Sequence, residues 1–398
     1  MYNVLQVFAD DCVERSTDRY ALDVATSHED DPPPNGTRPA DPSRRTSGRR
    51  ATIIDVARAA DVSVSAVSKV LRNAYGVSPQ MRERVTAAIE SLGYRPNAGA
   101  RSMRGRSYTV GVVIAEFGTP FQLEIAQAIA DELEPTSFHV VVVAGGVTPE
   151  RQKPRIEGLI DRQVDGLILV APFLDAASIE RVGQGLPIVT VALHGAAQHF
   201  DTVVTDERLG TRLVVDHLVA LGHRQIVHTS AASGAWDGDF VLSHTARRLG
   251  FEQAMRDHNL EPDIIETYYS EEGGYDAAVQ AFSRDPRPTA IFAGADIAAL
   301  GVLRAAEERG LRVPEDVTVV GYDNIYATTI NRVSLTTVDQ SGHSTGAASV
   351  RLLLERLNGR TEPKQFVVAP QLITRRTSGP PKRAPVRRDL AAQTPHEM

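Results

Sequence analysis

Apolar residues recur at helical spacing twice in the stretch 52–71, and a short polar break separates the two runs. Thr52 stands where the first run needs an N-cap, and Asp55 follows three residues later, as in a capping box. The break contains Asp61, a residue type that accepts the left-handed backbone of a tight turn. Ser63 is placed to cap the second run. The pattern therefore predicts two short helices joined by a tight turn.

The second of these helices has a predicted inner stripe of Val67, Val70 and Leu71 and an outer face of small and polar side chains. Such an outer face can approach base edges closely in the major groove of DNA. A helical hairpin inside a larger core has the same spacing, so the spacing alone leaves both interpretations open. The residues of this unit predicted to contact DNA are Thr52, Ser63, Val64, Ser65, Ala66, Ser68 and Lys69, the last five as an outward-facing first turn.

A third helix is predicted to begin at Ser78, which can cap it, with Pro79 at its first position and Gly93 at its end. Together the three helices predict an all-α helix-turn-helix unit over 51–95. The basic segment 96–106 that follows is too poor in apolar residues to hold a helix alone.

The texture changes at Tyr108, where short β-branched apolar runs begin to alternate with amphipathic helical stretches. The runs lack polar alternation, which is typical of strands buried on both faces of a parallel sheet. About 270 residues of this pattern exceed what one such sheet usually carries. We therefore predict a two-lobed α/β domain over 107–377, whose last segments cross back between the lobes.

The net charge of −7 hides an uneven distribution. Between Arg44 and Arg106 there are 13 Lys and Arg against 4 Asp and Glu, a balance of +9, so the remainder carries −7 − 9 = −16. A basic segment on an acidic chain is the electrostatic footprint of a DNA-binding module attached to another domain. The flanks 1–50 and 378–398 show no sustained periodicity and are predicted to be a disordered arm and tail.

The number of cysteines and the hydropathy of the chain indicate the cellular compartment in which we expect the protein. Cys12 is the only cysteine, so we predict neither a disulfide framework nor a Cys-based metal site. No apolar run approaches the roughly 20 residues that span a membrane. The apolar opening MYNVLQVFA lacks a basic leader and makes a poor signal peptide. These features favour a protein of the reducing cytoplasm with no membrane partner.

The run TIIDVARAADVSVSAVSKVL, followed by VSPQMRERVTAAIESLGYRPNAGARSMR, resembles the DNA-binding headpiece and hinge of the lactose/galactose repressor family. The resemblance implies that the segment matching 97–103 becomes a helix in the minor groove when two chains pair over DNA. A leucine of that family separates the central base step. Met103 stands at this position and is long and apolar enough to act as a wedge. The resemblance implies DNA contacts from Asn97, Ala100, Arg101, Met103 and Arg104.

The α/β half resembles the same family, whose effector domain has the two-lobed fold of periplasmic sugar-binding proteins. The matching motifs are HLVALGHRQI, ARRLGF, ADIAALGVLRA, RVPEDVTVVGYDN and LTTVDQ. Ligands of such sheets lie outside the carboxyl ends of the strands, and charged and aromatic side chains suit a hydroxylated ligand. The resemblance implies polyol contacts from Arg247, Asp323 and Gln340 and aromatic contacts from Phe121 and Tyr269, and the strand-end position adds Asp296.

Structural interpretations compete with several of these assignments, because a cap, a turn or a core position accounts for the same residue types. The chain departs from the family that it resembles at Ala192, where many members have an acidic or basic residue, and at Ala295, where Asn is usual. We therefore expect an effector that is smaller or less hydroxylated than a typical sugar, or one bound from other positions. The competing interpretations are a helix cap for Asp296, a turn for Asp323 and plain core positions for Phe121 and Tyr269.

Motifs of catalysis are missing from the sequence. It has no Gly-x-Gly-x-x-Gly after the first strand, no phosphate-binding loop, no Gly-x-Ser-x-Gly elbow and no His-Glu-x-x-His, so we predict no catalytic residue, metal or cofactor. The predicted function is a DNA-binding transcriptional repressor that acts as a homodimer on a near-palindromic double-stranded operator. A sugar-like effector between the lobes is predicted to control it, with the sign of the response left open. An α/β enzyme and a solute-binding protein are the alternatives.

Overall fold

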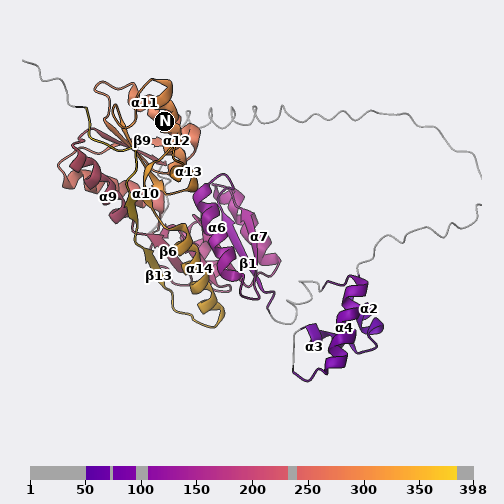
Figure 1. Ribbon diagram of the computed structural model, residues 1–398. Coiled ribbons are helices and arrows are strands. Elements are labelled where there is room, and N and C mark those ends of the chain that lie inside the picture. Colours follow the sequence, from indigo (N-terminus) through magenta and orange to yellow (C-terminus); the bar gives the residue numbers. More distant parts are fainter. Residues whose placement is uncertain (1–50, 72–74, 96–105, 232–239, 383–398) are drawn as a thin grey trace, which may run out of the picture. The chain divides into compact units, whose positions relative to one another are not determined.

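The computed structural model describes residues 51–71, 75–95, 106–231 and 240–382. The chain divides into two compact units, Met1–Arg95 and Pro96–Met398, and each is a fold of its own (Figure 1). The boundary coincides with the step from the predicted all-α unit to the basic segment.

The first unit is a bundle of three helices, as the periodicity predicts. Thr52 and Asp55 form the predicted capping box, in which the Asp55 carboxylate accepts from the Thr52 backbone N–H at 2.9 Å. Asp61 takes the predicted left-handed conformation, with φ of 51°. Val56, Val67 and Val85, one from each helix, are fully buried in the shared core. The helices are α2 (Ile53–Ala59), α3 (Val64–Leu71) and α4 (Pro79–Leu92).

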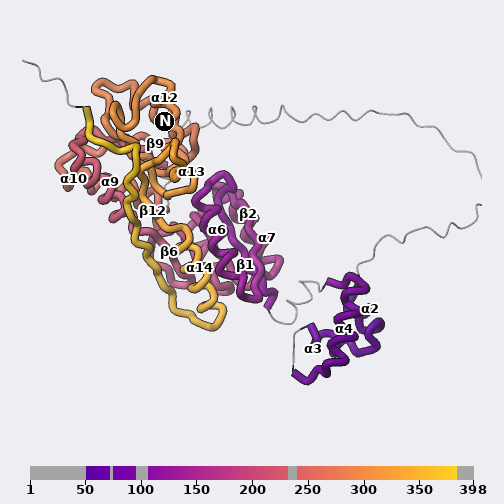
Figure 2. Tube along the Cα trace, in the orientation of Figure 1, coloured from indigo at the N-terminus to yellow at the C-terminus, as the bar shows by residue number. Residues whose placement is uncertain are grey.

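The second unit contains two six-stranded sheets, which define two lobes (Figure 2). The first lobe has the strand order β13-β6-β4-β3-β1-β2, and every pairing in it is parallel. The strands of this lobe are β1 (Thr109–Ile114), β2 (His139–Ala144), β3 (Gly166–Val170), β4 (Ile188–Val191), β6 (Asp201–Thr205) and β13 (Gln365–Val368). Its helices are α6 (Pro120–Leu133), α7 (Pro149–Asp161), α8 (Ala176–Gly183) and α14 (Gly342–Leu357).

The second lobe has the order β14-β12-β11-β10-β7-β9, with only the edge strand β14 antiparallel to its neighbour. The strands of this lobe are β7 (Ile226–Ala231), β9 (Asp263–Thr267), β10 (Ala290–Ala293), β11 (Thr318–Asp323), β12 (Thr336–Asp339) and β14 (Gln371–Ile373). Its helices are α9 (Glu207–Leu221), α10 (Ser243–Asp257), α11 (Glu271–Phe282), α12 (Asp296–Glu308) and α13 (Tyr326–Thr329).

Each sheet is buried on both faces, which explains the unbroken apolar runs of its strands. In the first lobe one core holds residues of α6 and α14, and the other holds residues of α7 and α8. In the second lobe α11 and α12 contribute to one core, and α9 and α10 to the other. The lobes thus have the layered architecture of a doubly wound parallel sheet.

Among the described residues, the chain passes between the two six-stranded sheets at three crossovers: from β6 to α9, from β12 to α14, and from β13 to β14. The last two confirm the prediction that the C-terminal segments cross back between the lobes, and the final crossing adds β14 to the second sheet. A two-stranded pairing of β5 (Leu193–His194) with β8 (Val241–Leu242) also links segments of the two halves. Leu242 is buried in the first-lobe core, although it leads directly into α10 of the second lobe.

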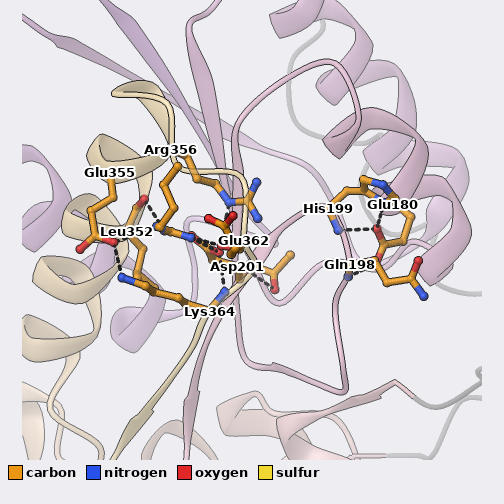
Figure 3. A network of polar contacts seen from close by, with 11 residues as sticks. Glu180, Gln198, His199, Asp201, Leu352, Glu355, Arg356, Glu362 and Lys364 are labelled. Carbon is orange, nitrogen blue, oxygen red and sulfur yellow. Dashed lines mark hydrogen bonds and ion pairs between the residues drawn. The ribbon is translucent and has the colours of Figure 1, made fainter.

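The C-terminal end of α14 is fixed by a buried carboxylate (Figure 3). Asp201, at the start of β6, is fully buried and lies 3.1 Å from Arg356 Nε and 2.5 Å from an Arg360 guanidinium nitrogen. The Lys364 backbone N–H also donates to this carboxylate, at 2.8 Å. Opposite charges with good geometry are what permit a carboxylate to be buried at such a position.

The start of the α/β unit is attached to the same region. The Arg106 guanidinium donates to the carbonyl of Leu357, the last residue of α14. Ser107 is buried, and both its backbone N–H and its hydroxyl donate to the Asp165 carboxylate at 3.0 Å. The chain that continues from the linker is therefore anchored on the first lobe.

Two residues that the sequence analysis assigns to the C-terminal tail are hydrogen-bonded into the second lobe. Ser378 Oγ lies 3.0 Å from His217 Nε2, and the Gly379 carbonyl lies 2.8 Å from Nε2 of the buried His223. Residues 383–398 of the tail lie outside the described residues.

Candidate functional site

Helix α3 and its N-cap carry most of the predicted DNA contacts of the headpiece. Ser63 Oγ accepts from the Ala66 backbone N–H at 3.2 Å, as expected of an N-cap, and lies 2.8 Å from Ser65 Oγ. Ser63, Ser65 and Lys69 are exposed, whereas Val64 and Ala66 are half-buried. The N-terminal turn therefore presents hydroxyl and methyl groups, and Lys69 adds an ammonium group from the last turn of α3. Such groups can read base edges.

Two residues of α3 have the opposite exposure from that predicted. Ser68 is 8% exposed and lies on the buried side with Val67 and Val70, so the prediction that it faces outward is wrong. Leu71, predicted for the inner stripe, is 37% exposed. An amphipathic helix buries an arc of about 100° or more, and here that arc takes in the position next to Val67 instead of the last residue of the helix.

The linker contacts implied by the family resemblance cannot be placed on the structure. They lie outside the described residues and are Asn97, Ala100, Arg101, Met103 and Arg104.

Arg247 is the centre of the predicted effector site, and its guanidinium is almost completely engaged with the protein. The side chain is 4% exposed. Its Nε and Nη2 donate to the two oxygens of Glu207 at 2.9 and 3.0 Å, and its Nη1 donates to the Gly294 carbonyl. The guanidinium carbon lies 3.7 Å from the centroid of the Tyr322 ring, in cation–π contact. Burial opposes the charge, but the Glu207 carboxylate outweighs it, so the pKa of Arg247 is raised.

Glu207 is a site residue that the sequence analysis missed. It is 2% exposed and opens α9 directly after β6. The rule that ligands lie beyond the carboxyl ends of strands, applied to β6, identifies this position. Its pairing with Arg247 is not apparent from the sequence, because 40 positions separate the two residues.

Asp323 and Gln340 lie in direct contact. Gln340 Nε2 donates to Asp323 Oδ1 at 2.6 Å, and both residues are buried. Asp323 has a φ of 132°, a conformation that residues with a side chain rarely adopt. Such strain is concentrated at functional sites. Burial and the neighbouring Asp296 carboxyl raise the pKa of Asp323 well above its ordinary value.

Asp296 is fully buried and bound to the protein through both oxygens. Oδ1 accepts from the Thr337 hydroxyl at 2.6 Å, and Oδ2 accepts from the Ile325 backbone N–H at 3.0 Å. It makes no side-chain cap of α12. Asp296 therefore stabilises the turn after β11 and connects it to β12. Its carboxylate does not cap α12, and both of its oxygens already accept hydrogen bonds from the protein.

The two aromatic candidates lie on different lobes. Tyr269 follows β9 and lies edge-on to His244, with ring centroids 6.4 Å apart. A Cβ at position 294 would lie 2.3 Å from the Tyr269 hydroxyl, so glycine is needed where Arg247 meets the Gly294 carbonyl. Phe121, on α6 of the first lobe, packs against the first-lobe core. The structure thus gathers five candidates at one edge of the second lobe, namely Arg247, Tyr269, Asp296, Asp323 and Gln340, and sets Phe121 apart from them.

Comparisons with known proteins agree with the division of the chain into a helical headpiece and an α/β unit. Residues 52–97 match the family described as bacterial regulatory proteins, lacI family, and residues 215–378 match the periplasmic binding protein-like domain. Within the described residues, no helix is both long and apolar enough to cross a membrane.

Full-length relatives show the same pattern. Catabolite control protein A of Priestia megaterium is 31% identical over 332 residues, which cover 82% of this chain and 98% of the relative. The lac repressor dimer bound to operator and an anti-inducer is 30% identical, with a TM-score of 0.72 over 83% of this chain and 100% of that chain. The transcriptional regulator CelR in complex with cellobiose is 28% identical, with a TM-score of 0.60 over the same shares of the two chains.

Identity above 30% across most of the chain, a headpiece match and a two-lobed α/β unit all point the same way. The chain belongs to the lacI family of bacterial regulatory proteins, DNA-binding transcriptional regulators controlled by a small-molecule effector.

Proposed function

We propose that the protein is a repressor that binds a near-palindromic operator as a homodimer and responds to a sugar-like effector. The observation that carries the DNA half is the Ser63-capped helix α3, which presents Ser65 and Lys69 to solvent within a matched lacI headpiece. A two-fold dimer presents two such turns, which require two half-sites related by symmetry.

The effector half of the proposal is supported by the second-lobe cluster and by a relative. A polar edge of Arg247, Asp323 and Gln340 beside Tyr269 suits hydroxyl groups and a sugar ring. CelR, of the same fold, is described in complex with cellobiose. In our proposal Phe121 meets the ligand from the first lobe, and the basic linker with Met103 contacts the operator centre. The domain limits proposed are 1–50 for the N-terminal arm, 51–95 for the headpiece, 96–106 for the linker and 107–377 for the effector domain. The tail 378–398 begins with Ser378 and Gly379, which are hydrogen-bonded into the second lobe.

The test is gel retardation of the DNA upstream of the protein's own gene, with and without a panel of neutral sugars. We expect one retarded complex of two chains per operator and a change in affinity with at least one sugar. Failure to retard this or any randomised DNA would contradict the proposal.

Lys69→Ala tests the placement of α3. A direct base contact is worth about 1–3 kcal/mol of discrimination, so selection from a randomised operator library should relax at one position of each half-site. Arg84→Ala, which removes an exposed cation from α4, is the matched control and should leave base preference unchanged. A uniform loss of affinity with Lys69→Ala would instead assign Lys69 to the phosphates.

A further inference from the structure

Glu207 joins two structural features, the crossover between the lobes and the buried Arg247 of the proposed effector site. It is the first residue of α9, at the crossover from β6 of the first lobe to the second lobe. Its carboxylate also accepts two hydrogen bonds from the buried Arg247 guanidinium. The pair is dry, with side chains 4% and 1% exposed.

The surrounding packing leaves this pair little freedom. Gly210 of α9 lies against Tyr322, the ring that Arg247 covers, and a Cβ at 210 would come within 2.2 Å of the Tyr322 hydroxyl. Gly250 of α10 approaches α9 so closely that a Cβ there would meet the Thr211 hydroxyl at 2.5 Å. These close approaches hold α9 and α10 at the separation that a bidentate Arg–Glu contact needs.

The charge balance of the cluster depends on Glu207. Among the described residues of the second lobe, Arg247 is the only buried Lys or Arg. An unpaired buried guanidinium would attract an anionic ligand strongly, because the interior screens charge weakly. Glu207 cancels that charge. Burial lowers the pKa of the neighbouring His194 and His244, so both are neutral near pH 7 and supply no replacement cation.

Resting on the proposed function, we infer that Glu207 is a specificity-determining residue that makes the effector site select neutral ligands and reject anionic ones such as sugar phosphates. Arg247 then offers an effector its remaining N–H groups as hydrogen-bond donors, without a net positive charge. Asp323 and Gln340 supply the complementary acceptor and amide.

Inorganic phosphate is the probe. We would measure the Tm of the full-length protein without DNA in phosphate and compare it with the Tm in chloride of equal ionic strength. Glu207→Gln keeps the size of the side chain and removes its charge. We expect about 10 mM phosphate to raise the Tm of this variant by about 3 °C beyond chloride, because an anion bound only to the folded state stabilises it. The parent protein and Glu207→Asp, which retains the carboxylate, should show no such increment.

Two further variants make the result specific. Glu252→Gln removes a carboxylate from Arg248, the adjacent and more exposed arginine of α10, and should not create a phosphate response. The double variant Glu207→Gln/Arg247→Gln removes both charges and should lose the response that Glu207→Gln gains.

The inference is overturned if Glu207→Gln folds and shows no phosphate increment, or if the parent responds to phosphate as the variant does. If Glu207→Gln is already unfolded in chloride, the test is whether phosphate restores a folded protein with a cooperative thermal transition. A restored transition supports the inference, and a variant that stays unfolded in phosphate overturns it. A parent protein that fails to retard operator DNA would contradict the proposed function and leave the phosphate result standing.

Discussion

At the scale of single residues, burial decides which polar groups are charged. His228 lies in β7, fully buried and stacked on Phe292 with ring centroids 4.5 Å apart. Its Nδ1 lies 3.0 Å from the Phe292 carbonyl, so the proton belongs on Nδ1 and the ring is neutral. Burial, and to a smaller extent the charges of Arg247 and Arg248, lowers the pKa of His228 to about 3.

His228 is expected to make the second lobe sensitive to acid. The pKa of His228 is about 3 in the folded protein, below the unfolded value of about 6.5. The contribution of neutral His228 to the free energy of unfolding is therefore fully present above about pH 6.5 and is lost as the pH falls toward about 3. Within this window His228 should lower the free energy of unfolding by about 1.4 kcal/mol per pH unit. His228→Leu should make the decline between pH 6 and 4 shallower by that amount in urea titrations. A slope equal to that of the parent would mean that His228 is protonated in the folded protein.

At the scale of elements, capping and periodicity predict helix limits better than they predict contacts. The sequence predicts a helix over 207–221, and α9 has these limits, since Asp206 caps it and Gly222 ends it in the left-handed conformation. Ala192 shows where prediction ends. Its φ of 63° breaks the apolar run 187–193 into β4 and β5. Positive φ is uncommon for a residue with a side chain, so an alanine in the sequence gives no reason to predict a turn between β4 and β5.

Pairings between distant elements could not be predicted for a related reason. Asp201 and Arg360 are 159 positions apart, and Glu207 and Arg247 are 40 apart. In the sequence each of these charged residues is indistinguishable from an ordinary surface residue. Only the order of the strands in the sheets shows which residue is its partner. The family resemblance identifies the positions of Arg247, Asp323 and Gln340, whereas their neighbour Glu207 requires the fold.

The Asp201 cluster should be among the strongest polar determinants of first-lobe stability. Asp201→Ala leaves Arg356, whose side chain is 7% exposed, and Arg360 without their buried partner. Breaking a buried ion pair in this way costs about 3–5 kcal/mol, which urea denaturation would measure. Glu355→Ala is the matched control, because it also removes a partner of Arg360 but from a side chain that is 35% exposed. That control should cost less than about 1 kcal/mol. Equal losses for the two variants would contradict this account.

At the scale of the whole α/β unit, α14 connects the effector cluster to the start of the unit. Its N-terminus follows Gln340, which bonds Asp323 in the second lobe, and its last carbonyl accepts from Arg106. The helix has 16 residues. With a rise of about 1.5 Å per residue, it spans about 24 Å. Gly346 packs against α6 so closely that a Cβ there would lie 2.6 Å from the Ala128 Cβ. We expect a helix packed this tightly to move as a rigid body, so that a change at Gln340 displaces the Leu357 carbonyl.

Arg106 is therefore expected to couple effector binding to DNA binding. Arg106→Gln shortens the side chain and removes its charge, which should loosen the contact with α14 and bring the ratio of operator affinities with and without effector closer to 1. Coupling free energies of this kind are about 1–3 kcal/mol, so a roughly 5- to 150-fold response has room to shrink measurably. By reciprocity, the effect of operator on effector affinity should diminish by the same factor. Effector affinity of the DNA-free variant should stay at the parent value, because Arg106 lies outside the effector cluster. Lys364→Gln, which removes an exposed cation beside the same end of α14, should leave the ratio intact. If Arg106→Gln lowered operator affinity equally with and without effector, Arg106 would be a phosphate contact and α14 would not carry the coupling.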